Sequence, residues 1–224
     1  MDWQAIGLSL RLSFCTTLIL VLLGLPLAWW LAQTRWRGRF LIEAVVALPI
    51  VLPPTVLGFY VLMAISPRSP LGMFYESWFG QRLPFSFQGL LLASVLYSLP
   101  FAVQPFISAF TTIDRRFLEA SWCLGESRTR TFFRVAIPLA WPGVLSGIVL
   151  SFAHTMGEFG VVLMVGGNLE GVTRTVSISI YDHVQALDYH TAGQTSLMML
   201  AFSFAVLAVT YSLQRRFVHA WPTR

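Results

Sequence analysis

The chain alternates long apolar segments with short polar connections. Five of these segments are long enough to cross a bilayer, which takes about 20 mostly apolar residues per helix. We expect each of them to be a helix, because a helix satisfies its own backbone hydrogen bonds in lipid. The pattern predicts an all-α integral membrane protein with one transmembrane domain over residues 1–224. The predicted spans are 5–32, 40–65, 89–110, 142–165 and 196–213.

Composition agrees with this pattern and excludes several other classes. Hydrophobic residues make up 56% of the 224 residues, charged residues only 11%, and the mean hydropathy is +0.68. A soluble domain normally carries about 25% charged residues. The net charge of +5 is spread over too apolar a chain to form a basic groove, so we expect no nucleic-acid partner. The partner implied by the composition is the lipid bilayer.

The basic residues predict how the spans are oriented. All fifteen are Arg, and cytoplasmic connections retain an excess of such residues. Eleven of them lie in three regions, which we expect to be cytoplasmic, and the odd number of spans then leaves the N-terminus outside and the C-terminus inside. These regions are the first connection (Arg35, Arg37, Arg39), the loop 111–139 (Arg115, Arg116, Arg128, Arg130, Arg134) and the tail (Arg215, Arg216, Arg224).

Three prolines interrupt the second predicted span. Pro49, Pro53 and Pro54 remove intrahelical hydrogen bonds, so the helix must bend or break there. The freed carbonyls need partners from neighbouring helices or from a wet cavity. Two interpretations are open, a packing kink or part of a translocation path.

The fourth predicted span contains an acid within an apolar run, in the sequence His154-Thr155-Met156-Gly157-Glu158-Phe159. His154 and Glu158 are four apart, which predicts that they share one helical face. An ionisable residue at this depth should face the bundle interior or water. The pair could make an interhelical hydrogen bond, line a translocation path or gate together with Phe159, hold a metal, or serve a membrane-embedded enzyme. No third ligand is spaced nearby, so no metal site is expected.

The outer segment 166–195 contains two Asp and two His at spacings that fit no common metal site. A short amphipathic surface helix over 177–187 is the preferred interpretation. The two cysteines, Cys15 and Cys123, lie far apart and predict neither a disulfide framework nor a zinc site. We therefore expect no metal and no bound cofactor.

The loop 111–139 is the most informative stretch of the sequence. Phe117, Ala120, Ser121 and Leu124 recur at helical spacing and predict a stripe of small and apolar residues. Gly125 follows as a helix stop, and a second helix is expected over 128–135. The spacing by itself also fits a solvated amphipathic loop on the headgroups.

The same loop resembles the EAA loop of ABC-importer permeases. Glu119-Ala120-Ser121, three residues, Gly125, nine residues and Val135-Ala136-Ile137-Pro138 follow the family pattern Glu-Ala-Ala, three residues, Gly, nine residues, Ile-x-Leu-Pro. Ser121, Val135 and Ile137 depart from it conservatively. The resemblance implies that Glu119, Ala120, Ser121, Gly125, Ile137 and Pro138 couple the chain to a cytoplasmic ATPase.

Further motifs are similar to the molybdate permease family of ABC importers, the ModB type. They are Leu48–Pro54, Gly157–Gly160 and Gly167–Thr175, and sulfate and tungstate permeases are close relatives. The resemblance implies a type I importer fold in a bacterial inner membrane. It also implies a second copy of the chain, two ATPase subunits and a periplasmic oxyanion-binding protein. The chain has no GxxxxGK[ST] phosphate loop, so it is expected to be a permease subunit and not an enzyme.

Overall fold

The computed structural model describes residues 2–220, with side chains up to Ser212. Within this range every regular element is a helix. Arg224 lies outside the described residues, and the side chains of Arg215 and Arg216 are not described. The helices are α1 (Trp3–Gln33), α2 (Arg39–Val51), α3 (Pro54–Ile65), α4 (Pro70–Phe79), α5 (Phe87–Thr111), α6 (Arg115–Cys123), α7 (Arg128–Thr131), the π-helical turn η1 (Phe132–Ala136), α8 (Ile137–Met156), α9 (Gly160–Gly166), α10 (Val176–Gln185) and α11 (Tyr189–Ala220).

The centre of the bundle is formed by α1, α5 and α8. Large side chains of α5, among them Phe106 and Phe110, are fully buried between the other two helices. Small residues let the helices approach closely: a Cβ added to Gly143 of α8 would lie 2.5 Å from the Cβ of Ala109 of α5. Close approach through small residues is how membrane helices gain packing energy when lipid tails are as apolar as the side chains.

Four helices are long and apolar enough to cross a membrane, and one bent pair of helices can supply a fifth span. The prediction of five apolar spans therefore agrees with the fold, if the bent pair counts as one. The long helices are Trp3–Gln33, Phe87–Thr111, the continuous run Arg128–Met156 and Tyr189–Ser212.

The second predicted span is broken at its prolines. The helices α2 and α3 meet at Leu52 and Pro53 with a bend of 114°. A single proline, Pro49, is accommodated inside α2, but the consecutive Pro53 and Pro54 supply no N–H at two successive positions, and Pro54 takes the first position of α3, where no N–H is needed. The expected break is confirmed.

The fourth predicted span, 142–165, is not one continuous helix in the structure. The helix α8 ends at Met156, and α9 begins at Gly160. At its other end α8 begins before the predicted start, because α7 and η1 continue into it without a break. The π-helical turn ends at Ala136, two residues before Pro138, whose ring would clash with the carbonyl of Arg134 in a regular α-helix.

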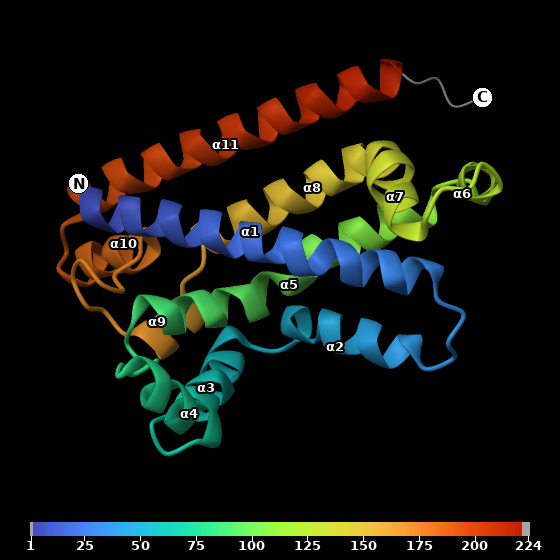
Figure 1. The fold of residues 1–224 in the computed structure, drawn as a ribbon. Helices are drawn as coiled ribbons and strands as arrows, with labels where there is room; N and C mark the ends of the chain where they lie inside the picture. The colour runs from blue at the N-terminus through green and yellow to red at the C-terminus, as the bar shows by residue number, and fades with distance from the viewer. Residues whose placement is uncertain (1, 221–224) are drawn as a thin grey trace.

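The elements divide between the two ends of the bundle (Figure 1). The N-terminal end of α1 lies at one end together with α3, α4, α9 and α10. At the other end lie the connection between α1 and α2, the helices α6 and α7, and the later turns of α11. The Arg-rich connection 34–38 and the Arg-rich loop 111–139 are thus at the same end.

Candidate functional site

The loop between α5 and α8 folds into a short helix, α6, held against the bundle by one face. Asp114 begins α6 by accepting a hydrogen bond from the Arg116 N–H at 2.9 Å, as an N-cap residue does. Leu118 is buried in the core, and the Ser121 and Thr131 hydroxyl oxygens lie 2.9 Å apart in a buried hydrogen bond. These two inward contacts fix which face of α6 points away from the protein.

The outward face of α6 carries both apolar and charged side chains. Phe117 is 57% exposed and Leu124 84% exposed, and Ala120 between them is exposed as well. Glu119 is on the surface in an ion pair with Arg115 at 3.2 Å. The stripe expected from Phe117, Ala120, Ser121 and Leu124 is therefore wrong in one member, because Ser121 points inward to Thr131.

Gly125 ends this helix in the left-handed conformation, with φ +83°. Its N–H donates to the Trp122 carbonyl, and the Glu126 N–H donates to the Ser121 carbonyl. A left-handed residue after a helix favours glycine, which has no Cβ to clash. Ile137 and Pro138, the end of the same motif, form the first turn of α8.

Glu158 lies in the gap between α8 and α9 and is only 4% exposed. Its Oε2 accepts a hydrogen bond from the Ser94 hydroxyl of α5 at 2.9 Å. Its Oε1 is buried and has no hydrogen-bond partner among the described residues. Through this hydrogen bond, Glu158 connects the gap between α8 and α9 to α5 at the centre of the bundle.

His154 makes its contacts elsewhere. Its Nδ1 lies 3.0 Å from the hydroxyl of Ser98, and its ring stacks on Phe101 with the centroids 3.7 Å apart. The expectation that His154 and Glu158 share one helical face is wrong, because α8 ends between them. An interhelical hydrogen bond is present for each, to separate serines of α5. The only signal for Ser94 and Ser98 in the sequence is their spacing of four in an apolar run.

The two interruptions of the bundle touch each other. Pro49 is buried within α2, and Pro53 and Pro54 are exposed at the break. A Cβ added to Gly160 would lie 2.7 Å from the Cβ of Pro54, so the start of α9 lies directly on the start of α3. Residues far apart in the sequence thus form one junction of broken helices.

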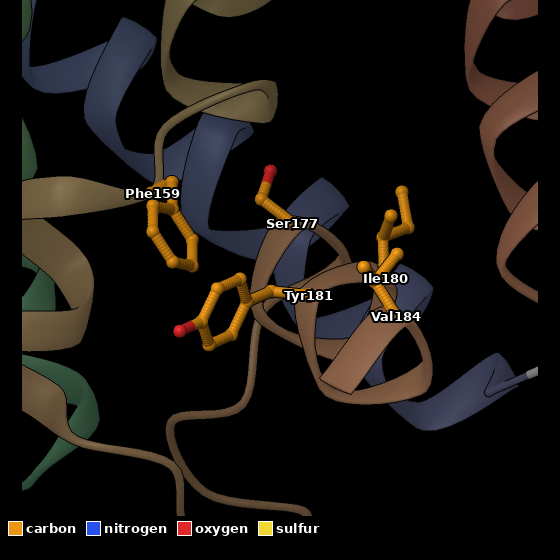
Figure 2. A pocket seen from close by; sticks show the side chains of 5 residues that line it. All are labelled: Phe159, Ser177, Ile180, Tyr181 and Val184. Carbon is orange, nitrogen blue, oxygen red and sulfur yellow. The ribbon is translucent and has the colours of Figure 1, made fainter. Parts of the chain in front are cut away.

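Phe159 projects from this junction towards α10 (Figure 2). Its ring centroid is 5.1 Å from that of Tyr181, and the two rings border a groove of about 390 Å³. Ser177, Ile180 and Val184 of α10 complete the lining. The predicted surface helix over 177–187 is present as Val176–Gln185, but its position beside Phe159 has no signal in the sequence.

The outer loop contains a polar cluster centred on Arg174. The guanidinium Nε donates to the Asn168 side-chain oxygen at 2.7 Å and lies 3.6 Å from an Asp182 carboxylate oxygen. Nearby, hydrogen bonds from Thr191 lower the pKa of Asp188 at the start of α11. Among the side chains that the structure describes, which end at Ser212, no three His, Cys, Asp or Glu lie together as metal ligands.

Comparison with known proteins assigns the chain to a family. Residues 24–221 match the model of the binding-protein-dependent transport system inner membrane component. The molybdenum transport system permease protein ModB of Azotobacter vinelandii is 51% identical over 214 residues, which cover 96% of this chain and 95% of that protein. The sulfate transport system permease protein CysT of Salmonella typhimurium is 30% identical over 213 residues, which cover 95% of this chain and 76% of that protein.

A solved structure agrees with the fold. The crystal structure of a bacterial alginate ABC transporter, in complex with its alginate pentasaccharide-bound periplasmic protein, superposes with a TM-score of 0.76. It covers 95% of this chain and 78% of the compared chain, at 18% sequence identity. The chain belongs to the family of inner membrane components of binding-protein-dependent transport systems, with ModB-type permeases among its relatives.

Proposed function

We propose that this family member is the transmembrane subunit of an ATP-driven importer that carries molybdate across the bacterial inner membrane. One observation carries the proposal: 51% identity to a molybdenum transport permease over nearly the full length of both chains. The sulfate permease relative is 30% identical, which favours molybdate over sulfate as the substrate. Tungstate, which has the same charge and tetrahedral shape, is the second cargo that we expect for the same path.

The permease leaves ATP hydrolysis to a partner subunit. Its sequence has no phosphate-binding loop, and α6 offers a surface on which an ATPase can dock. Phe117 and Leu124 are large apolar side chains exposed on a protein surface, flanking the small Ala120. Exposed apolar residues grouped in this way mark an interaction site. In this proposal Glu119, Ala120 and Gly125 belong to the docking surface, while Ser121, Ile137 and Pro138 hold α6 and α8 in place behind it.

The proposed orientation has the N-terminus outside and the C-terminus inside. It is supported by the Arg-rich connections, since the connection 34–38 and the helices α6 and α7 lie at the same end of the bundle (Figure 1). Arg and Lys are retained on the cytoplasmic side. The outer loops around Arg174 and α10 then face the periplasm, where an oxyanion-binding protein would dock.

A second copy of the chain completes the path in this proposal. The junction formed by Pro53, Pro54, Glu158 and Phe159 lies at the side of one bundle, with Pro53 and Pro54 exposed. Two copies facing each other would enclose such a junction between them. In this arrangement the broken helices and His154 lie along the path or its gate.

The test is uptake of radiolabelled molybdate by cells that lack their own molybdate permease. These cells would express the chain with the ATPase and the oxyanion-binding protein encoded beside it. We expect the cells to take up labelled molybdate. Unlabelled molybdate or tungstate should reduce this uptake, and a tenfold excess of sulfate should leave it nearly unchanged. Uptake of sulfate without molybdate would overturn the substrate assignment, and no uptake of either anion would overturn the transport function.

A further inference from the structure

Two exposed tryptophans lie together where α1 ends. Trp30 is in the last turn of the helix and is 44% exposed, and Trp36, in the connection to α2, is 53% exposed. Their ring centroids are 6.4 Å apart. The Trp36 ring also lies against the backbone of Gly38, since a Cβ added there would overlap it. The two indoles therefore form a pair on the surface, held in place by contacts within the connection.

Two arginines without partners flank this pair. Arg35 and Arg37 are both exposed, one on each side of Trp36 in the sequence. Neither side chain makes an ion pair or a hydrogen bond with a residue that the structure describes. By contrast, the Arg82 guanidinium lies 3.3 Å from a Glu76 carboxylate oxygen. The connection between α1 and α2 thus presents two positive charges that no described acid offsets.

The face of α1 that carries Trp30 continues as an apolar surface towards the middle of the helix. Pro26 and Leu23 precede Trp30 by four and seven residues, which places them on the same face. Both are exposed, Leu23 to 65%. Seven residues correspond to about 10 Å along a helix. The surface therefore changes from apolar to aromatic to positively charged within a few turns.

This order matches the layers of a phospholipid at the edge of a bilayer. Indole rings favour the depth of the headgroups, between the acyl chains and water. A guanidinium group binds phosphate through paired hydrogen bonds, and basic residues directly beside a membrane helix attract anionic lipids. The helix that precedes the connection is long and apolar enough to cross a membrane, so its end lies at headgroup depth.

We infer that this surface at the end of α1 is a binding site for an anionic phospholipid of the phosphatidylglycerol type. Arg35 and Arg37 hold its phosphate, the Trp30/Trp36 pair covers its glycerol backbone, and one acyl chain follows the apolar face of α1. A lipid is favoured over a protein partner because the surface is continuous with the exposed apolar face of a spanning helix. The site requires only the membrane location of the chain and is independent of the transported substrate.

Native mass spectrometry of the purified full-length permease tests the inference, because it counts bound lipids by their mass. The protein is titrated with phosphatidylglycerol, with phosphatidylcholine of the same acyl chains, and with phosphatidylglycerol in the presence of millimolar inorganic phosphate. One double variant, Arg35→Gln with Arg37→Gln, removes both charges, and a second, with Lys at both positions, retains them. The matched control is Arg68→Gln, which removes an exposed arginine without an ion pair among the described residues, outside this connection.

A further variant, Trp36→Ala, keeps both charges and removes one of the indoles. Thermal melting of every variant without added lipid checks that it is folded. We expect unchanged melting for the arginine variants, because the substituted side chains are exposed and unpaired.

We expect the unsubstituted permease to bind phosphatidylglycerol at least about tenfold more tightly than phosphatidylcholine, since each arginine near a membrane surface contributes about fivefold. The Gln double variant should lose most of this preference, and the Lys double variant and Arg68→Gln should keep it. Trp36→Ala should weaken the binding of both lipids.

Unchanged phosphatidylglycerol binding by the Gln double variant, or by Trp36→Ala, would overturn the inference. An equal loss in Arg68→Gln would also overturn it, because the protein would then respond to its net charge alone. Displacement of the lipid by inorganic phosphate would show a site for free anions in place of a lipid site.

Discussion

Pro54 and Gly160 lie in direct contact, although more than a hundred residues separate them in the sequence. A Cβ on Gly160 would come within 2.7 Å of the Pro54 Cβ, and the neighbouring Gly58 lies equally close to Met164. The first turns of α3 and α9 are thereby packed as one unit next to both helix breaks. Since proline cannot continue α2 and glycine allows α9 to approach, each break depends on the other for its position.

The first prediction concerns this contact. Gly160→Val places two methyl groups where Pro54 already lies, so we expect a loss of about 1–3 kcal/mol in stability, typical of overpacking. The thermal melting of the purified permease measures it. Gly7→Val is the matched control, since a Cβ there meets nothing within 4 Å. Equal melting temperatures for the two variants would contradict the packing described here.

The second prediction concerns coupling through Gly125. Gly125→Val forces a β-branched residue into the left-handed region, at a cost of roughly 1–2 kcal/mol. We expect normal insertion into the membrane, weak stimulation of the ATPase and little uptake. Gly125→Asn is the control, because Asn tolerates this conformation and no atom lies within 4 Å of an added Cβ. If Asn fails as fully as Val, a close partner rather than backbone strain explains the glycine.

The third prediction concerns the buried pair of Ser94 and Glu158. Ser94→Ala removes the one hydrogen bond to Oε2 and leaves both carboxylate oxygens without a described partner, so we expect a loss of about 1–3 kcal/mol. The double variant Ser94→Ala with Glu158→Leu removes both polar groups and should recover most of that loss. Thermal unfolding of the two variants in one detergent decides it. Additive losses would contradict a direct interaction.

The fourth prediction concerns topology. A reporter fused after Arg37 or Arg130 should read as cytoplasmic, and one fused after Arg82 or Glu170 as external. The physical reason is the retention of Arg on the cytoplasmic side. Alkaline phosphatase and green fluorescent protein fusions give opposite signals at each position and so control for expression. A reversed signal at any of the four positions would refute the five-span orientation.

The fifth prediction concerns affinity for the anion. Arg11 is the one basic residue inside a predicted span, and its guanidinium lies over the Phe87 ring at 4.6 Å, which leaves no second cation in the spans to hold an anion. Without a fixed cation we expect molybdate to bind the permease more weakly than the micromolar range. Calorimetry on the purified permease, titrated with sodium molybdate, measures this. Micromolar binding with preference over sulfate would place a true anion site within the membrane.

Much of this protein can be read from short stretches of its sequence. A run of about 20 apolar residues must span the membrane or be buried, so the four long helices were predictable from the apolar runs in the sequence. The break at Pro53 and Pro54 was also predictable, because the missing N–H is a property of the residue itself. The motif from Glu119 to Pro138 indicated the family, because its spacing is preserved within one loop.

The tertiary structure alone decided which groups meet. The sequence between Met156 and Gly160 contains no proline, and its one local signal for the gap is Gly157, the C-cap of α8, so His154 and Glu158 were wrongly placed on one face. Ser121 belongs to a helical stripe by spacing, yet Thr131 ten residues later draws it inward. Which faces of α5 and α8 remain open likewise depends on where α1 packs. Local periodicity determines that a segment is helical, whereas the contacts between distant segments determine where the helix ends and which side of it meets water.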